Sequence, residues 1–219
     1  MRLGATQINR ESLQSQAKDA ITQAILNKLF APGDRVNETR IANSLTLSRS
    51  TVRAAIQELV HEGLLISTPR RGTIVMPSTS EGADELQSMR EALERLAVQR
   101  AVRHRTAEEV EVLWERYHTA YDAIRNGDVG LSYKLDLALH QQVVNMARHS
   151  LLAAHYQLIE HKMLLYMAHA GGAFLTEEAF KRQHLNIVEG IANGDLQQAV
   201  DGLDIHFREA SELLIGLFT

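Results

Sequence analysis

The second half of this chain contains no proline. From Asp84 to the end of the 219 residues, apolar side chains recur with the period of an α-helix. Proline inside a helix removes a backbone hydrogen bond and clashes with the preceding turn, so its absence favours uninterrupted helices. We predict an all-helical region with six helices, over residues 84–104, 106–125, 131–147, 151–170, 176–192 and 195–217.

A basic helix within Asn37–Gly63 points to contact with nucleic acid. The stretch predicts two short helices joined by a tight turn, and the second begins at Ser48, a residue type that caps helices. Its apolar residues share one stripe, whereas Arg49, Arg53 and Gln57 lie on the opposite face. Long polar side chains one turn apart suit a helix in the major groove of DNA. The alternative is an ordinary amphipathic helix on the protein surface.

Two short β-prone runs follow this helix. Leu64–Thr68 and Thr73–Met76 flank Pro69–Gly72, a sequence typical of a hairpin turn. Arg70 and Arg71 give the predicted tip two positive charges. A helix-turn-helix with a basic hairpin behind it can place the helix in one groove and the hairpin against the adjacent backbone.

The net charge changes sign along the chain. Up to Pro77, ten Lys and Arg against six Asp and Glu give +4, whereas the rest of the chain gives −8, for a total of −4. Positive charge therefore lies where DNA binding is predicted, and the acidic part should face away from phosphates. The chain has no cysteine, no apolar run long enough to span a membrane and no signal peptide, so we expect a soluble cytoplasmic protein.

Four potential metal ligands occur on apolar stripes of the predicted bundle. Asp136 and His140 are one helical turn apart, and His184 and His206 lie on the last two predicted helices. Imidazoles and a carboxylate that converge within a bundle suit a divalent transition metal. The alternative is a set of core histidines that only form hydrogen bonds.

The N-terminal motifs together resemble those of the GntR-type winged-helix transcription regulators. The resemblance covers about fifty residues, ILNKLFAPGDRVNETRIANSLTLSRSTVRAAIQELVHEGLLISTPRRGTIV. It implies that DNA is contacted by Ser48, Arg49 and Arg53 of the second helix and by Gly72 of the hairpin.

Two positions depart from the pattern of that family. Thr46 stands where the turn usually has Gly, and a β-branched residue tolerates a positive φ poorly. Thr39 stands where an arginine is frequent, with Arg40 beside it, so either residue is a candidate for the DNA contact.

The second half resembles the FCD domain, the ligand-binding module of the FadR subgroup of the same family. The matching motifs are LDLALH, HLNIVEGIANGD and DIHFREA. The resemblance implies a metal site formed by Asp136, His140, His184 and His206, with Zn, Ni or Mn as the candidate ions.

An effector site is predicted next to the metal. The resemblance implies that Arg90, on an inward stripe of the first bundle helix, lies near the ligand and pairs with its carboxylate. An ion pair with Glu94, four residues on, is the alternative. Tyr133, Tyr166 and Asn186 are further candidates for the lining of the pocket.

These observations predict a mainly α protein with three parts: a winged helix-turn-helix DNA-binding domain over residues 1–77, a linker over 78–82, and an all-helical ligand-binding and dimerisation domain over 83–219. We expect a homodimeric repressor that is not an enzyme, binds a palindromic double-stranded operator and responds to a small carboxylate. The alternatives are a regulator whose effector is the metal itself, and a metal-dependent enzyme with a basic N-terminal domain.

Overall fold

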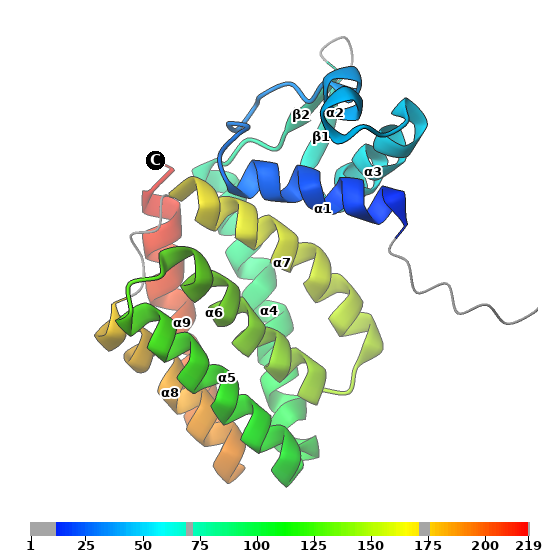
Figure 1. The fold of residues 1–219 in the computed structure, drawn as a ribbon. Coiled ribbons are helices and arrows are strands. Elements are labelled where there is room, and N and C mark those ends of the chain that lie inside the picture. Colours follow the sequence, from blue (N-terminus) through cyan, green and yellow to red (C-terminus); the bar gives the residue numbers. More distant parts are fainter. Residues whose placement is uncertain (1–11, 69–71, 171–175, 219) are drawn as a thin grey trace, which may run out of the picture. The chain divides into compact units, whose positions relative to one another are not determined.

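A computed structural model describes residues 12–68, 72–170 and 176–218 of the chain. The chain divides into two compact units, Met1–Pro77 and Ser78–Thr219 (Figure 1). The predicted fold class is confirmed, because a winged helix-turn-helix is followed along the chain by an all-α bundle. None of the described helices is long and apolar enough to cross a membrane.

The first unit contains three helices and a hairpin. The helices are α1 (Leu13–Leu26), α2 (Glu38–Leu45) and α3 (Arg49–His61), and strands β1 (Leu65–Thr68) and β2 (Gly72–Val75) pair antiparallel. Helix α1 packs against α3. The core between these elements is apolar, and Ile25, Ile56 and Leu59 are fully buried in it. This packing fixes the position of α3, and the opposite face of that helix is exposed.

The turn between α2 and α3 takes an unusual backbone conformation. Thr46 is the C-cap of α2 and adopts a left-handed conformation with φ 56° and ψ 40°. A non-glycine residue in this conformation costs roughly 1–2 kcal/mol. The turn therefore keeps a backbone conformation that favours glycine, although Thr46 is strained in it. Asn37 and Ser48 cap the N-termini of α2 and α3 through their side-chain oxygens, as expected for these residue types.

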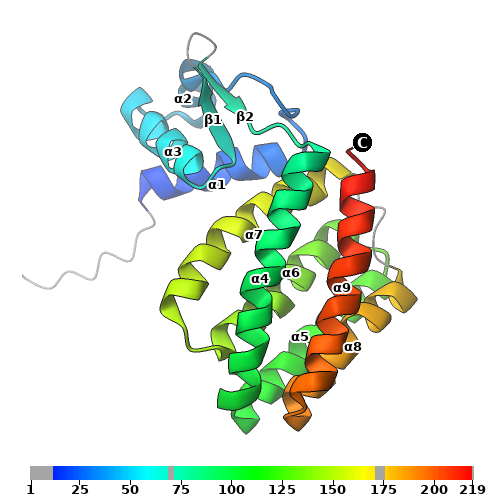
Figure 2. The same cartoon turned by 180° about the vertical axis from the view of Figure 1, so that it is seen from behind.

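The second unit is a bundle of six helices within the described residues. Its helices are α4 (Ser80–His104), α5 (Ala107–Arg125), α6 (Val129–Met146), α7 (Ser150–Ala170), α8 (Glu177–Asn193) and α9 (Leu196–Gly216). Helix α9 packs against both α4 and α8 (Figure 2). A capping box begins α5, because the Thr106 side chain accepts from the backbone N–H of Glu109 while the Glu109 side chain accepts from the backbone N–H of Thr106.

The first bundle helix begins earlier than predicted. The first bundle helix was expected to begin at Asp84, but α4 begins at Ser80, within the predicted linker. Thr79 is the reason, because its hydroxyl accepts from the backbone N–H of Gly82 and caps the helix four residues earlier. Helix α4 therefore covers three of the five residues predicted as linker.

Two glycines allow α8 and α9 to approach closely. A Cβ on Gly190 of α8 would lie 2.7 Å from Cα of Ala199, and one on Gly202 of α9 would lie 2.8 Å from the backbone nitrogen of Ile187. Real Cβ atoms do not approach backbone atoms so closely, so only glycine fits at these positions. The contact matters for function because α8 bears His184 and α9 bears His206.

We expect the Gly190→Ala substitution to destabilise the protein by roughly 1–3 kcal/mol, because the added methyl group separates α8 from α9. Urea unfolding followed by circular dichroism measures the change. Gly216→Ala is the matched control, since nothing lies within 4 Å of its added Cβ, and its stability should stay within about 1 kcal/mol of the parent. Equal stability of the two variants would contradict the close helix contact.

Candidate functional site

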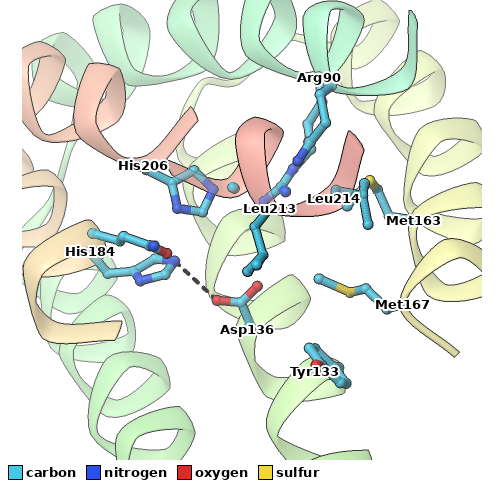
Figure 3. A pocket seen from close by; sticks show the side chains of 12 residues that line it. Arg90, Tyr133, Asp136, Met163, Met167, His184, His206, Leu213 and Leu214 are labelled. Carbon is cyan, nitrogen blue, oxygen red and sulfur yellow. Dashed lines mark ion pairs between the residues drawn. The ribbon is translucent and has the colours of Figure 1, made fainter. Parts of the chain in front are cut away.

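Four polar side chains from three helices meet in the second unit. Asp136 and His140 come from α6, His184 from α8 and His206 from α9, and none is more than 3% exposed. One potential ligand atom from each of the three histidines lies within 4.8 Å of the others. Figure 3 shows His184 and His206 on one side of the pocket with Asp136 beside them. All four predicted metal ligands are thus brought together.

Hydrogen bonds indicate which ring nitrogen holds the proton in two of these histidines. His140 Nδ1 lies 2.6 Å from Glu94 Oε2, and His184 Nδ1 lies 2.9 Å from the carbonyl oxygen of Phe180. A carboxylate and a carbonyl only accept, so we assign a proton to each Nδ1, which leaves each Nε2 facing the cluster. Histidines that bind metals are commonly oriented by such partners.

Three potential ligand atoms therefore face one another. His184 Nε2 lies 3.2 Å from His140 Nε2 and 3.0 Å from Asp136 Oδ1. Acceptor atoms at these distances repel unless a proton or a cation lies between them. Two ligand atoms that are each about 2.1 Å from a shared ion lie roughly 3 Å apart. The donor set and its spacing therefore fit a divalent cation.

His206 provides the third imidazole. Among the residues that the structure describes, neither of its ring nitrogens has a hydrogen-bond partner, although the side chain is buried. Burial and the nearby histidines hold the pKa of His206 well below its ordinary value. Burial also lowers the pKa of His140, although Glu94 opposes this effect. Both rings are therefore neutral near pH 7, the form in which imidazole binds metal.

Glu94 connects this cluster to the rest of the bundle. Its carboxylate accepts from Arg90 Nε at 2.7 Å, from the Tyr156 hydroxyl at 2.7 Å and from His140 Nδ1. Burial alone would raise the pKa of Glu94, but Arg90 and His140 outweigh burial and lower it to about 2. The sequence suggests Glu94 only as an alternative partner for Arg90, and that ion pair is present.

A cavity of about 40 Å³ adjoins the cluster. It is lined by Gln87, Arg90, Tyr133, Asp136, Met163, Met167, Gln183, His184, His206, Ala210, Leu213 and Leu214. Figure 3 shows Arg90 extending from α4 into this space. Its Nε is bonded to Glu94, whereas Nη2 is buried without a hydrogen-bond partner among the described residues. The ion pair therefore leaves this second nitrogen of the guanidinium for another acceptor.

Two of the predicted effector residues lie elsewhere. Tyr133 lines the cavity, but Tyr166 and Asn186 are not among its lining residues. The Tyr166 hydroxyl instead accepts from the backbone N–H of Thr79 at 3.3 Å. Asn186 belongs to the α8–α9 contact, where its Cβ lies 2.9 Å from the Cβ position of Gly202. Both were chosen by residue type, which does not fix the direction of a side chain.

Several residues that line the cavity are not predicted from the sequence. Gln87 lies three positions before Arg90 on the same buried stripe of α4, and this spacing was a usable signal. Met163 and Met167 are spaced like ordinary core residues. Only the packing of α7 and α9 distinguishes them as walls of a cavity.

The predicted DNA-contacting residues lie on the first unit. Ser48 caps α3 by accepting from the backbone N–H of Thr51 at 3.1 Å, and Arg49 begins that helix with an exposed side chain. Arg53, one turn later, donates from Nε and Nη2 to one carboxylate oxygen of Glu38, at 3.1 and 3.0 Å. Arg40 is exposed on α2.

The hairpin is described except at its tip. Gly72 begins β2 with φ +81°, a conformation that side chains rarely adopt, and its Cβ position lies 3.3 Å from Nε of Arg35. Arg70 and Arg71, predicted to contact the DNA backbone, lie outside the described residues.

Two family models match the chain. "Bacterial regulatory proteins, gntR family" matches residues 13–75, and "FCD domain" matches residues 85–209. These ranges correspond to the first unit and to most of the second.

Individual proteins match over nearly the whole chain. It is 29% identical over 208 residues to the uncharacterized HTH-type transcriptional regulator YdhC of Bacillus subtilis, covering 91% of this chain and 89% of that protein. It is 28% identical over 201 residues to a probable D-xylose utilization operon transcriptional repressor of Paenarthrobacter nicotinovorans, covering 91% and 87%. The fold resembles the solved structure of E. coli McbR/YncC with a TM-score of 0.82 at 19% identity, covering 96% and 100%.

We expect the His206→Ala substitution to weaken binding of Zn²⁺ or Ni²⁺ by about 100-fold or more, because it removes one ligand of the cluster. Isothermal titration calorimetry on metal-free protein measures the affinity. His155→Ala, which changes an exposed histidine of α7, should bind metal like the parent. A His206→Ala variant with unchanged affinity would exclude this histidine as a ligand.

We expect Glu94→Gln to lower metal affinity by about 10- to 100-fold, because the charged acceptor that orients His140 is lost. Glu85→Gln, at an exposed position on the same helix, serves as the control. Circular dichroism of the metal-free variants checks that each is folded. A folded Glu94→Gln variant with parental affinity would show that the orientation of His140 does not depend on this charge.

Proposed function

The chain belongs to the GntR family of bacterial regulatory proteins and contains an FCD domain, and from this premise we propose that it is a metal-containing, ligand-responsive repressor that acts as a homodimer. The family makes the chain a transcriptional regulator. This confirms the expectation that it is not an enzyme and sets aside the alternative of a metal-dependent enzyme. In the proposal, residues 1–77 bind DNA, 78–82 form the linker, and 83–219 bind the ligand and dimerise.

The cluster formed by Asp136 and the three histidines is the observation that supports a bound metal most directly. Asp136, His140, His184 and His206 would hold Zn²⁺, Ni²⁺ or Mn²⁺, all of which accept imidazole and carboxylate ligands. A bound ion would relieve the repulsion among Asp136 Oδ1 and the two Nε2 atoms, which lie 3.0 and 3.2 Å apart. It would also present a Lewis-acidic position to an oxygen atom of the effector.

The effector is proposed to be a small carboxylate in the adjoining cavity. Arg90 Nη2 is the group that would bind it, because this buried donor has no partner among the described residues. Glu94 holds the guanidinium in place through Nε. Binding the carboxylate would then cost little loss of side-chain freedom, and Tyr133 would contribute to the wall.

The competing proposal is that the metal itself is the effector. The cavity next to the cluster and the unpaired nitrogen of Arg90 favour an organic ligand. Titration of metal against operator affinity separates the two proposals. A structural metal should leave operator affinity unchanged once the site is saturated, and a sensed metal should change it over the physiological range.

DNA binding is proposed to depend on the first unit of each protomer. Arg49 and Arg53 of α3 would contact the major groove, Ser48 and Arg40 the phosphates beside it, and the hairpin from Arg70 to Gly72 the neighbouring backbone. Two such helices at a fixed separation match a palindromic operator. An effector that binds one dimer arrangement more tightly shifts its population and with it the affinity for DNA. The name of the Paenarthrobacter nicotinovorans relative supports repression.

We expect selection of genomic fragments by the purified protein to recover a short palindrome. On that operator, Arg49→Ala should lower affinity by about 10- to 100-fold, since it removes a cation that faces the groove. Arg116→Ala, at an exposed position on α5 of the second unit, is the matched control. Fluorescence anisotropy at fixed salt gives both affinities. Unchanged binding by Arg49→Ala would refute the proposed placement of α3.

A further inference from the structure

Two buried side chains of α4 each bring to the cavity one polar atom that has no partner among the described residues. Gln87 and Arg90 lie three positions apart and are 2% and 1% exposed. Among the described residues, Gln87 Oε1 and Arg90 Nη2 have no hydrogen-bond partner. Folded proteins rarely bury such atoms unsatisfied unless something completes them. A ligand that occupies the cavity can satisfy both, with a negative group at Arg90 and a hydrogen-bonding group at Gln87.

The opposite wall of the cavity is apolar. Met163 and Met167 come from α7, and Leu213 and Leu214 come from α9 (Figure 3). Among the described lining residues, none on this wall is charged. Thioether side chains adapt to the shape of a small alkyl group. This side of the cavity therefore suits an aliphatic end of the ligand and does not suit a second carboxylate.

The charges around the cavity favour one negative charge on the ligand. Arg90 and Glu94 form an ion pair and neutralise each other. A divalent ion beside the Asp136 carboxylate then leaves one positive charge, which a single carboxylate balances. A second carboxylate would be buried without a partner, which is costly. Glu160 of α7 is partly buried and interacts with Arg90, and any charge on it makes a second carboxylate less favourable still.

We propose that the cavity binds a short aliphatic hydroxycarboxylate with a single carboxylate group. Its carboxylate meets Arg90 and the metal, its hydroxyl meets Gln87, and its alkyl end packs on the wall of Met163, Met167, Leu213 and Leu214. The inference rests on the proposed function, because it takes the metal and Arg90 as the anchor of the effector. The volume of about 40 Å³ sets the scale of the ligand, since it equals the space of about three water molecules.

Three acids with the same four-carbon chain test this inference on the full-length protein loaded with Zn²⁺ and freed of excess metal. They are butanoate, 2-hydroxybutanoate, and malate, which has a second carboxylate in place of the methyl group. Isothermal titration calorimetry should show 2-hydroxybutanoate binding at least about tenfold more tightly than either of the other two acids. Equal or tighter binding of malate overturns the single carboxylate, and equal binding of butanoate overturns the hydroxyl contact.

Variants identify the residues responsible. Gln87→Leu should abolish the preference for 2-hydroxybutanoate over butanoate, whereas Gln99→Leu, exposed on the same helix, should keep it. Met167→Lys places a cation on the apolar wall and should shift the preference toward malate. A ratio of two affinities does not change with stability alone, so a merely structural effect would leave these preferences intact. A Gln87→Leu protein that retains the preference overturns the assignment.

The failure of this inference can be distinguished from failure of the proposed function. If none of the three acids binds to protein that holds Zn²⁺ and recognises its operator, the ligand class is wrong and the proposed function stands. If the protein holds no metal, this outcome contradicts both the inference and the proposed function.

Discussion

The buried carboxylate of Glu94 holds the ligand-binding unit together. Removing a carboxylate from water costs several kcal/mol unless other groups replace its hydration, and here donors from three helices do so. Arg90 comes from α4, His140 from α6 and Tyr156 from α7. Each bond also orients a group that faces the pocket or supports it. The hydrogen bonds that stabilise the buried charge of Glu94 also orient His140 and Arg90, so stability and function are linked.

The close contact between α8 and α9 completes the cluster. Gly190 and Gly202 remove the side chains that would keep these helices apart, and the approach brings the ring of His184 to 4.7 Å from that of His206. A bundle with ordinary side chains at these glycines would hold the two imidazoles farther apart. The geometry of the histidine cluster is thus a consequence of backbone packing as much as of the side chains themselves.

Helix α3, by contrast, presents an exposed and weakly held ion pair. Arg53 is exposed and paired with Glu38, and such surface pairs contribute only about 0–1 kcal/mol. The arginine can therefore leave this partner at small cost. Thr46 shows that the turn geometry is kept even where the residue opposes it, since the packing of α2 and α3 fixes its left-handed backbone.

The sequence by itself determined the mainly α class, the helix-turn-helix and its hairpin, and helix positions mostly within a few residues. Hydrophobic period, capping residues and breakers act locally and can be recognised along the chain. It also indicated Asp136 and the three histidines, because each lies on an apolar stripe. Only the tertiary structure decided that Glu94 orients His140, that Gln87 and two methionines line the cavity, and that Tyr166 and Asn186 face elsewhere. Those properties depend on how helices distant in sequence cross, and residue type does not encode the direction of a side chain in a bundle.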